Sequence, residues 1–513
     1  GWAGGKLNAT SVLLEPLGAD AAASLLERLG EGLDPEARSR IVSASQGNPL
    51  FLEEMASLAL ERGTMTVPPT IQALLSARLE RLAVEERELL ERGAVEGEVF
   101  HRLALRALAE ERLAAELEPR LAALVRKELI RPHPATLEGD DAFRFRHLLI
   151  RDAAYDGLPK ATRAQLHERF ADWLEQNALA IAELDEIAGW HLEQAVRYCR
   201  ELGRDAAPGL AVRAAERLHA AGRRAGERSD ATAARNLLDR ALTLATQGGS
   251  RRASIAIELA EQLIELGEYE RVDELLSIGE SDPELAGLAA LGRFGWALRA
   301  HPQNALGTIE SLLPGLLDEF ERTGNERGIA RVHEAWSFAH WLRSCATPAA
   351  EHALLAAEHA RRAGDEGMRA RALGHYLGTL SFGDVDTKTI AAEVERIERD
   401  ASGAFLASWL DIVRGELADL AGRFDDGLRF TQRSVDRLRE MGLLTLTGAA
   451  HQHTAWIRQR SGDLKGALAD LRRGDQILAD LDEHSYRSTS QAMLAEIHEQ
   501  LGDRSAALAA VGL

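Results

Sequence analysis

The chain has 513 residues, more than one hydrophobic core usually spans, and this length predicts roughly two to four domains. Its 61 basic and 81 acidic side chains give a net charge of −20, which disfavours nucleic-acid phosphates and anionic membranes as partners. Cys199 and Cys345 are too few for a disulfide framework or a zinc site and indicate reduced thiols in a cytoplasmic protein. The sequence has no uninterrupted apolar run of about 18 residues, so we expect no membrane span. The high Ala, Leu, Glu and Arg content favours a mostly α protein.

The first residues, GWAGGK, lack an initiating Met and a signal-peptide pattern, so we expect a fragment of a longer protein. The glycines and Lys6 invite comparison with a phosphate-binding loop. However, the spacing is one residue short of G-x-x-x-x-G-K, and Leu7 stands where Ser or Thr would bind magnesium. An ordinary surface turn is the better interpretation. The following TSVLLEPL, residues 10–17, predicts one buried strand without a nearby partner strand.

Residues 18–66 show three helical patterns, which predict a small helical domain. Asp34-Pro35 and Asn48-Pro49 are each typical of an N-cap followed by proline at the first helical position. In GNPLFLEEM, residues 47–55, we expect Glu53 and Glu54 to complement the helix dipole and to repel an anion. If Pro49 contacts a ligand, the residues around it suit an apolar, planar group better than a phosphate.

Residues 67–150 predict a winged-helix domain, with three helices closed by a β-hairpin. The first helix carries an apolar face, and the hairpin is indicated by KELIRPHP, a Gly-Asp-Asp turn and the alternating AFRFRH. Such domains often bind DNA, but these residues include 13 Lys/Arg and 15 Asp/Glu, a poor footprint for nucleic acid. We therefore expect a packing module without direct nucleic-acid contact. Residues 151–204 are expected to form linker helices.

Residues 205–513 predict an α-solenoid because a triplet of small residues recurs with offsets of +7 and +12. The first member is expected to let two helices touch, the second to turn the chain, and the third to seat the returning helix. The five triplets are Gly222/Ser229/Ala234, Ala260/Gly267/Val272, Gly415/Gly422/Gly427, Ala455/Gly462/Ala467 and Ala495/Gly502/Ala507. Room for roughly three degenerate units remains between Gly267 and Gly422, giving about eight tetratricopeptide-like helix pairs in total.

Individual residues offer few candidates for chemistry. His147, at the end of the expected hairpin, can donate to an anion with Arg144 and Arg146 nearby, although a structural role is the commoner one. HEAWSFAH, residues 333–340, spaces its histidines seven apart and is better explained as a repeat-helix face than as a metal site. No nucleophile–base arrangement is recognisable, so we predict neither a catalytic residue nor a metal site.

Taken in chain order, LLEPL, GNPLFLEE, FRFRHLLIRDAAY and the solenoid resemble the C-terminal part of a STAND-type, AAA-related signalling ATPase. The sequence is most similar to actinobacterial-type regulators that link this ATPase to an adenylate/guanylate cyclase domain or a LuxR-type DNA-binding domain. The resemblance implies that residues 1–17 hold the last strand of a truncated nucleotide-binding domain and that residues 18–66 form its helical lid.

The resemblance also implies a nucleotide site for ATP or ADP, with Mg²⁺ held by the missing domain. The proline of the lid would contact adenine and falls on Pro49. The histidine near the end of the winged helix would contact the β-phosphate of ADP and falls on His147, although Arg146 and Leu148 replace the methionine and aspartate of the family's motif. Because the chain lacks the phosphate loop, we expect it not to hydrolyse ATP alone.

Two functional hypotheses follow. In the first, the chain is the regulatory, effector-sensing part of an ATP/ADP switch in signal transduction or transcriptional control. Its partners would be the missing N-terminal nucleotide-binding domain and a protein or small-molecule effector on the solenoid, with a nucleotide-dependent oligomer left open. In the second, the solenoid is a nucleotide-independent scaffold for protein–protein interaction. A dedicated DNA-binding regulator would need domains outside this chain.

Overall fold

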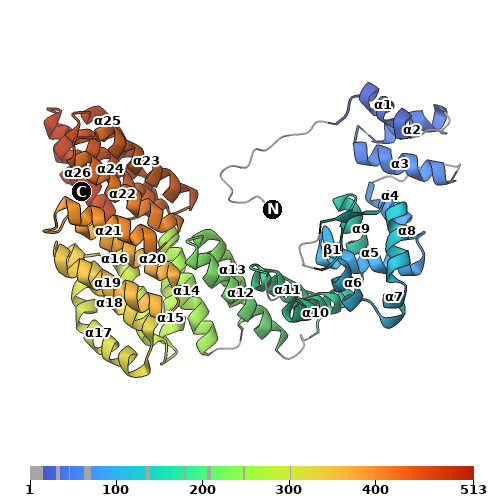
Figure 1. Ribbon diagram of the computed structural model, residues 1–513, viewed down its shortest axis with the longest axis horizontal. Coiled ribbons are helices and arrows are strands. Elements are labelled where there is room, and N and C mark those ends of the chain that lie inside the picture. The colour runs from blue at the N-terminus through green and yellow to red at the C-terminus, as the bar shows by residue number, and fades with distance from the viewer. Residues whose placement is uncertain are drawn as a thin grey trace. The chain divides into compact units, whose positions relative to one another are not determined.

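The computed structural model describes residues 16–29, 35–45, 47–62, 71–134, 139–177, 181–204, 209–246, 249–300, 302–401 and 403–512. These residues contain 27 helices and one three-stranded sheet, which confirms the predicted mostly α fold class. The chain divides into two compact units, Gly1–Ala214 and Ala215–Leu513 (Figure 1). The GWAGGK turn and most of the expected strand lie outside the described residues, and Pro16 and Leu17 belong to no strand. The five-part domain division remains a prediction.

Three helices open the first unit: α1 (Ala19–Leu29), α2 (Pro35–Ser45) and α3 (Pro49–Arg62). As predicted, α2 and α3 each begin at a proline, where the missing N–H would have no helical partner. Leu26, Ile41 and Leu52 are fully buried where the three helices meet. The chain before α1 is held to the α2–α3 turn, because the Leu17 amide donates to the Gly47 carbonyl at 2.8 Å.

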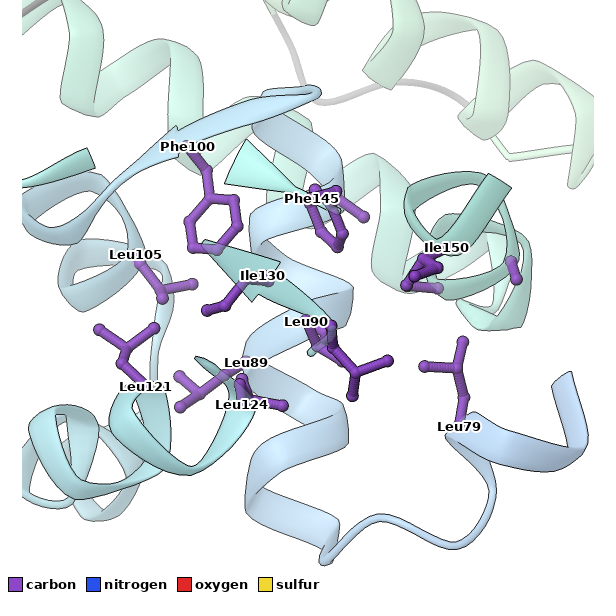
Figure 2. Packing of buried hydrophobic residues seen from close by; sticks show 14 of the residues in the cluster. Leu79, Leu89, Leu90, Phe100, Leu105, Leu121, Leu124, Ile130, Phe145 and Ile150 are labelled. Carbon is purple, nitrogen blue, oxygen red and sulfur yellow. The ribbon is translucent and has the colours of Figure 1, made fainter. Parts of the chain in front are cut away.

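A winged helix follows, built from α4 (Ile71–Leu79), α5 (Val84–Glu96), β1 (Val99–His101), α6 (Arg102–Leu108), α7 (Glu111–Ala115), α8 (Leu117–Arg126), β2 (Ile130–His133) and β3 (Ala142–Phe145). The predicted hairpin β2–β3 is present, and β1 adds a third antiparallel strand on the other side of β3. Figure 2 shows Phe100 and Phe145 above the leucines of α5, with ring centroids 5.2 Å apart. Strand β1 was missed because a three-residue strand carries almost no sequence periodicity.

The first unit continues through α9 (Leu148–Gly157), α10 (Lys160–Asn177) and α11 (Leu184–Glu201). A buried polar chain joins them: the Tyr155 hydroxyl lies 2.7 Å from Nε2 of His167, and Nδ1 of His167 lies 2.8 Å from Nδ1 of His191. Burial lowers the pKa of His167 to about 3 and that of His191 well below its ordinary value. Both rings are therefore neutral at pH 7.

Sixteen helices of the described residues form eight consecutive antiparallel pairs, the number that the sequence predicts. Figure 1 shows those of the second unit stacked one after another, coloured from green to red. In order they are α12 (Leu210–Glu227), α13 (Ala231–Leu244), α14 (Ser250–Leu266), α15 (Val272–Glu280), α16 (Ala286–Ala300), α17 (Pro302–Thr323), α18 (Glu326–Leu342), α19 (Ala346–Arg362), α20 (Glu366–Leu380), α21 (Thr387–Asp400), α22 (Ala404–Leu420), α23 (Phe424–Glu440), α24 (Leu444–Arg460), α25 (Leu464–Asp480), α26 (Ser485–Gln500) and α27 (Arg504–Val511). Three pairs, α16 to α21, fill the interval that lacked recognisable triplets.

The triplets occupy the positions expected of them. Each second member turns the chain inside a pair with a left-handed backbone, at φ values of 61° for Ser229, 76° for Gly267, 73° for Gly422, 88° for Gly462 and 81° for Gly502. The first and third members are buried in the first four triplets and half-buried in the last, at Ala495 and Ala507. A Cβ added at Gly415 would sit 3.1 Å from the Gly427 carbonyl oxygen, so the backbones of α22 and α23 approach closely because neither residue has a side chain.

The second unit curves until its first helix pairs touch its later ones. A Cβ at Gly367 of α20 would lie 2.7 Å from Cα of Glu227, at the end of α12. A Cβ at Gly267, which follows α14, would lie 2.8 Å from Cδ2 of Leu481, between α25 and α26. These contacts join early helix pairs of the solenoid to later ones. They lie around the space on the inner side of the curve.

Candidate functional site

The first candidate site contains the two residues implied to bind nucleotide. Pro49 is exposed at the start of α3, where Oδ1 of Asn48 caps the helix by accepting from the amides of Leu50 at 3.0 Å and Phe51 at 3.2 Å. His147 is the N-cap residue of α9. Its Nε2 lies 3.4 Å from Oε2 of Glu53, one helical turn after Pro49. The structure thus brings the two regions together through Glu53, although no described contact joins Pro49 to His147 directly.

The sequence predicts that Glu53 and Glu54 complement the dipole at the start of α3, and their position shows that this prediction is wrong. Both lie in the second turn, beyond the exposed amides of the helix start. Glu54 instead forms an ion pair with Arg78, whose Nη2 also donates to the Lys127 carbonyl oxygen at 2.8 Å. The two carboxylates therefore connect α3 to the winged helix, a role that local sequence could not reveal because their partners are distant in the chain.

The arginines beside His147 are already paired with carboxylates. Nε of Arg144 donates to Oε1 of Glu98 at 2.9 Å, and Arg146 forms an ion pair with Glu128. His147 therefore faces a carboxylate, while its neighbouring guanidiniums are engaged elsewhere. A phosphate bound at His147 would have to displace Glu53.

The second candidate site is a cavity of about 880 Å³ inside the solenoid. Every one of the eight helix pairs contributes to its wall, mainly through the first helix of the pair. Aromatic walls come from Phe294, Phe338, Trp341, Phe405 and Trp409, while Arg331, Arg371 and several carboxylates supply charge. A volume of this size lies in the ordinary range of small-molecule sites. Sequence reasoning missed the cavity because its wall residues lie up to 263 positions apart, from Gly226 to Thr489.

A chain of partly buried ion pairs, centred on the buried Glu258 carboxylate, supports one wall of the cavity. Glu258 of α14 accepts from Nη1 of Arg327 of α18 at 2.9 Å and lies 2.9 Å from Nε2 of His219 of α12. Burial raises the pKa of the Glu258 carboxyl, but the hydrogen bonds with His219 and Arg327 outweigh it and bring the pKa to about 2. Helices that are not neighbours in sequence are thereby locked together.

The same wall continues to Arg331, one helical turn after Arg327. Arg331 pairs with Glu261 of α14 and, at 3.2 Å, with Glu334 of its own helix. Arg371 of α20 lies 3.9 Å from Glu334, beyond hydrogen-bonding distance. Arg331 is therefore engaged by two carboxylates, whereas Arg371 makes only a long ion pair with Glu334.

HEAWSFAH lies in α18, as the repeat-helix interpretation predicts. Nδ1 of His333 is 3.0 Å from Nδ1 of His352, and the rings of His340 and His352 stack at 5.4 Å. Within the described ranges, no group of three or more His, Cys, Asp or Glu side chains could hold a metal ion. In the same ranges, every helix is too short or too polar to cross a bilayer. Cys199 and Cys345 are free thiols.

The fold defines a helical-repeat protein with a tetratricopeptide-like solenoid. No protein-family model and no curated protein matches the chain. Among solved structures it is similar to a signal transduction ATPase with numerous domains (STAND) protein with a tetratricopeptide repeat sensor from Pyrococcus horikoshii, at 14% identity and TM-score 0.49, covering 98% of this chain and 72% of that one. It is also similar to the Cut9–Hcn1 hetero-tetramer of the APC/C, at 10% identity and TM-score 0.35, covering 96% and 89%. At TM-scores below 0.5, neither likeness defines a function.

Proposed function

We propose that the chain senses an effector in the solenoid cavity and couples it to a nucleotide-controlled switch of the STAND type. The observation that carries the proposal is the cavity itself, to which all eight helix pairs contribute. The curvature of a solenoid is the sum of small rotations between neighbouring repeats. A ligand that touches the first and last pairs together favours one curvature over the others, and this differential binding is what a switch requires.

The nucleotide half of the proposal concerns the first unit. Pro49 is exposed and would provide a face for adenine, while His147 would exchange the Glu53 carboxylate for the β-phosphate of ADP. The parent protein would supply the phosphate loop and Mg²⁺ from a nucleotide-binding domain. The proposal therefore gives α3 and α9 two arrangements. In one, Glu53 contacts His147, and in the other, the bound nucleotide contacts His147.

The test measures release of fluorescently labelled ADP from the intact parent protein. Pro49→Ala and His147→Ala should each speed ADP release, whereas Glu53→Gln should slow it because the competing carboxylate is neutralised. Arg112→Ala, at an exposed ion pair with Glu85, is the matched control and should leave release unchanged. Unchanged release in both the Pro49 and the His147 variants would refute the assigned nucleotide contacts.

A nucleotide-independent scaffold is the second candidate. It is favoured by Phe382 and Trp456, which are 47% and 38% exposed and stack with ring centroids 5.7 Å apart. Exposed aromatic residues are common at the centres of protein–protein interfaces. Titration of ATP and ADP into the intact parent separates the candidates, since the scaffold binds neither.

A further inference from the structure

Among the described residues that line the cavity, His375 has a buried ring nitrogen without a hydrogen-bond partner. His375 of α20 lines the cavity, its ring stacked on Phe338 with centroids 4.2 Å apart. Its Nε2 is buried and has no hydrogen-bond partner among the described residues. Leaving a buried polar atom unsatisfied costs about 1–3 kcal/mol, so a ligand donor that displaces the atoms covering Nε2 would relieve that cost.

The hydrogen-bond network assigns the protons of the His375 ring. The Ser337 hydroxyl has one hydrogen, which it donates to the Ala349 carbonyl oxygen at 2.6 Å. The same hydroxyl oxygen lies 2.9 Å from Nδ1 of His375, and it can therefore only accept there. Nδ1 thus carries the proton, and burial lowers the pKa of the ring to about 4. At pH 7 Nε2 is an unprotonated acceptor.

The charges of the cavity disfavour an anion. Its carboxylates outnumber its guanidiniums: Glu261, Glu265, Glu334 and Glu483 stand against Arg331 and Arg371. Arg331 is held between Glu261 and Glu334. A phosphate or carboxylate ligand would have to break the pairs of Arg331, or bind at Arg371 alone in a site whose carboxylates outnumber its guanidiniums, whereas a neutral or cationic ligand would meet neither cost.

We propose that the cavity binds a neutral or cationic ring compound that donates an N–H or O–H hydrogen bond to Nε2 of His375, and that it excludes phosphates and carboxylates. The aromatic walls formed by Trp341, Trp409 and Phe338 receive the ring. The inference rests on the proposed sensing function and names the ligand class of that site. It also makes the effector in the cavity chemically different from the nucleotide bound at Pro49 and His147, because a cavity that excludes phosphates does not bind a nucleotide.

The test is calorimetric titration of the full chain with four probes that share one naphthalene ring. Naphthylethanol and naphthylethylamine each carry a donor, the methyl ether of naphthylethanol lacks one, and naphthylacetate is an anion. We expect saturable binding of the alcohol and the amine, with the ether and the acetate at least about tenfold weaker, as expected when one buried hydrogen bond is lost or a charge is repelled. Absence of binding by the alcohol and the amine, or tightest binding by the acetate, would overturn the ligand class.

Two variants locate the binding. Gly295 of α16 lines the cavity, and a Cβ added there meets no atom within 4 Å, so Gly295→Leu should fill the space without strain and abolish binding. Gly307→Leu, at a helix glycine outside the cavity where an added Cβ also meets no atom within 4 Å, is the matched control and should bind as the unaltered chain does. His375→Phe keeps the ring but removes the acceptor, and it should erase the preference for the alcohol over the ether. Binding that survives Gly295→Leu, or a preference that survives His375→Phe, contradicts the site.

Failure of this ligand class can be told apart from failure of the proposed function. The Gly295→Leu substitution is placed in the intact parent and ADP release is measured. If no probe binds but the plugged cavity still alters ADP release, the sensing function stands and only the ligand class is wrong. If probes bind as expected but the plugged cavity leaves ADP release unchanged, the ligand class stands and the coupling to nucleotide is wrong.

Discussion

Glu258 and Arg327 are 69 residues apart in the chain and meet in a 2.9 Å hydrogen bond that joins α14 to α18. Glu258 is only 6% exposed, and Arg327 also pairs with Asp365, at 3.5 Å. The pair fastens the second helix pair of the solenoid to the fourth. We therefore expect substitutions in this pair to change the curvature of the second unit.

Glu258→Gln should lower the unfolding free energy of the solenoid by about 1–3 kcal/mol, because Arg327, whose side chain is 35% exposed, loses its charge-assisted hydrogen bond to the buried Glu258 carboxylate. Urea denaturation followed by circular dichroism measures the loss. Asp239→Asn, at the exposed pair of Asp239 with Arg271, is the matched control and should cost less than about 1 kcal/mol. Equal effects of the two substitutions would show that the Glu258–Arg327 pair does not hold the superhelix.

Acid should destabilise the first unit through His167 and His191. Their pKa values are lowered by burial, that of His167 to about 3, with Arg151 adding positive charge nearby. Below pH 6.5 the unfolded chain binds protons that the folded chain does not, so stability falls as the pH drops from 6.5 towards 3. Thermal melts across this range should show a smaller loss for His167→Phe, while His133→Gln, a hairpin histidine, should follow the unaltered chain. A pH slope unchanged in His167→Phe would exclude this origin.

The contact between Gly415 and Gly427 should not tolerate a side chain. A Cβ at Gly415 would lie 2.6 Å from Cγ2 of Thr431, so Gly415→Ala should lower the unfolding free energy by about 1–3 kcal/mol through overpacking. Gly307→Ala, in a helix position with no atom within 4 Å of the added Cβ, should be neutral or stabilise by up to about 1 kcal/mol. Chemical denaturation of both variants distinguishes close packing from a general effect of replacing glycine.

Arg78 should control docking of α1–α3 on the winged helix, because it binds both Glu54 and the Lys127 carbonyl. Arg78→Met should let α1 and α2 open locally, so that trypsin cleaves at their arginines about tenfold faster, as one lost buried charge contact allows. The winged-helix core would stay folded. Arg112→Met, which breaks only an exposed pair, should be cleaved at the original rate, and equal rates for both variants would rule out the docking role.

The sequence by itself determined the local architecture. The triplet spacing was enough for eight helix pairs, since a left-handed turn and a close helix contact each demand a small residue at a fixed position, as at Gly462 and Gly415. Pro35 and Pro49 marked helix starts for an equally local reason. The alternation of AFRFRH predicted the hairpin, whereas the three residues of β1 were too few to show a period.

Only the tertiary structure decided where these elements meet. The contact of Glu53 with His147, the pairing of Glu258 with Arg327 and the unpartnered Nε2 of His375 all depend on segments distant in the chain. The cavity depends on them most, because small rotations between repeats add up until the first and last pairs face each other. No single stretch of sequence encodes that sum, so a local pattern can predict the helix pairs but not the site that they enclose.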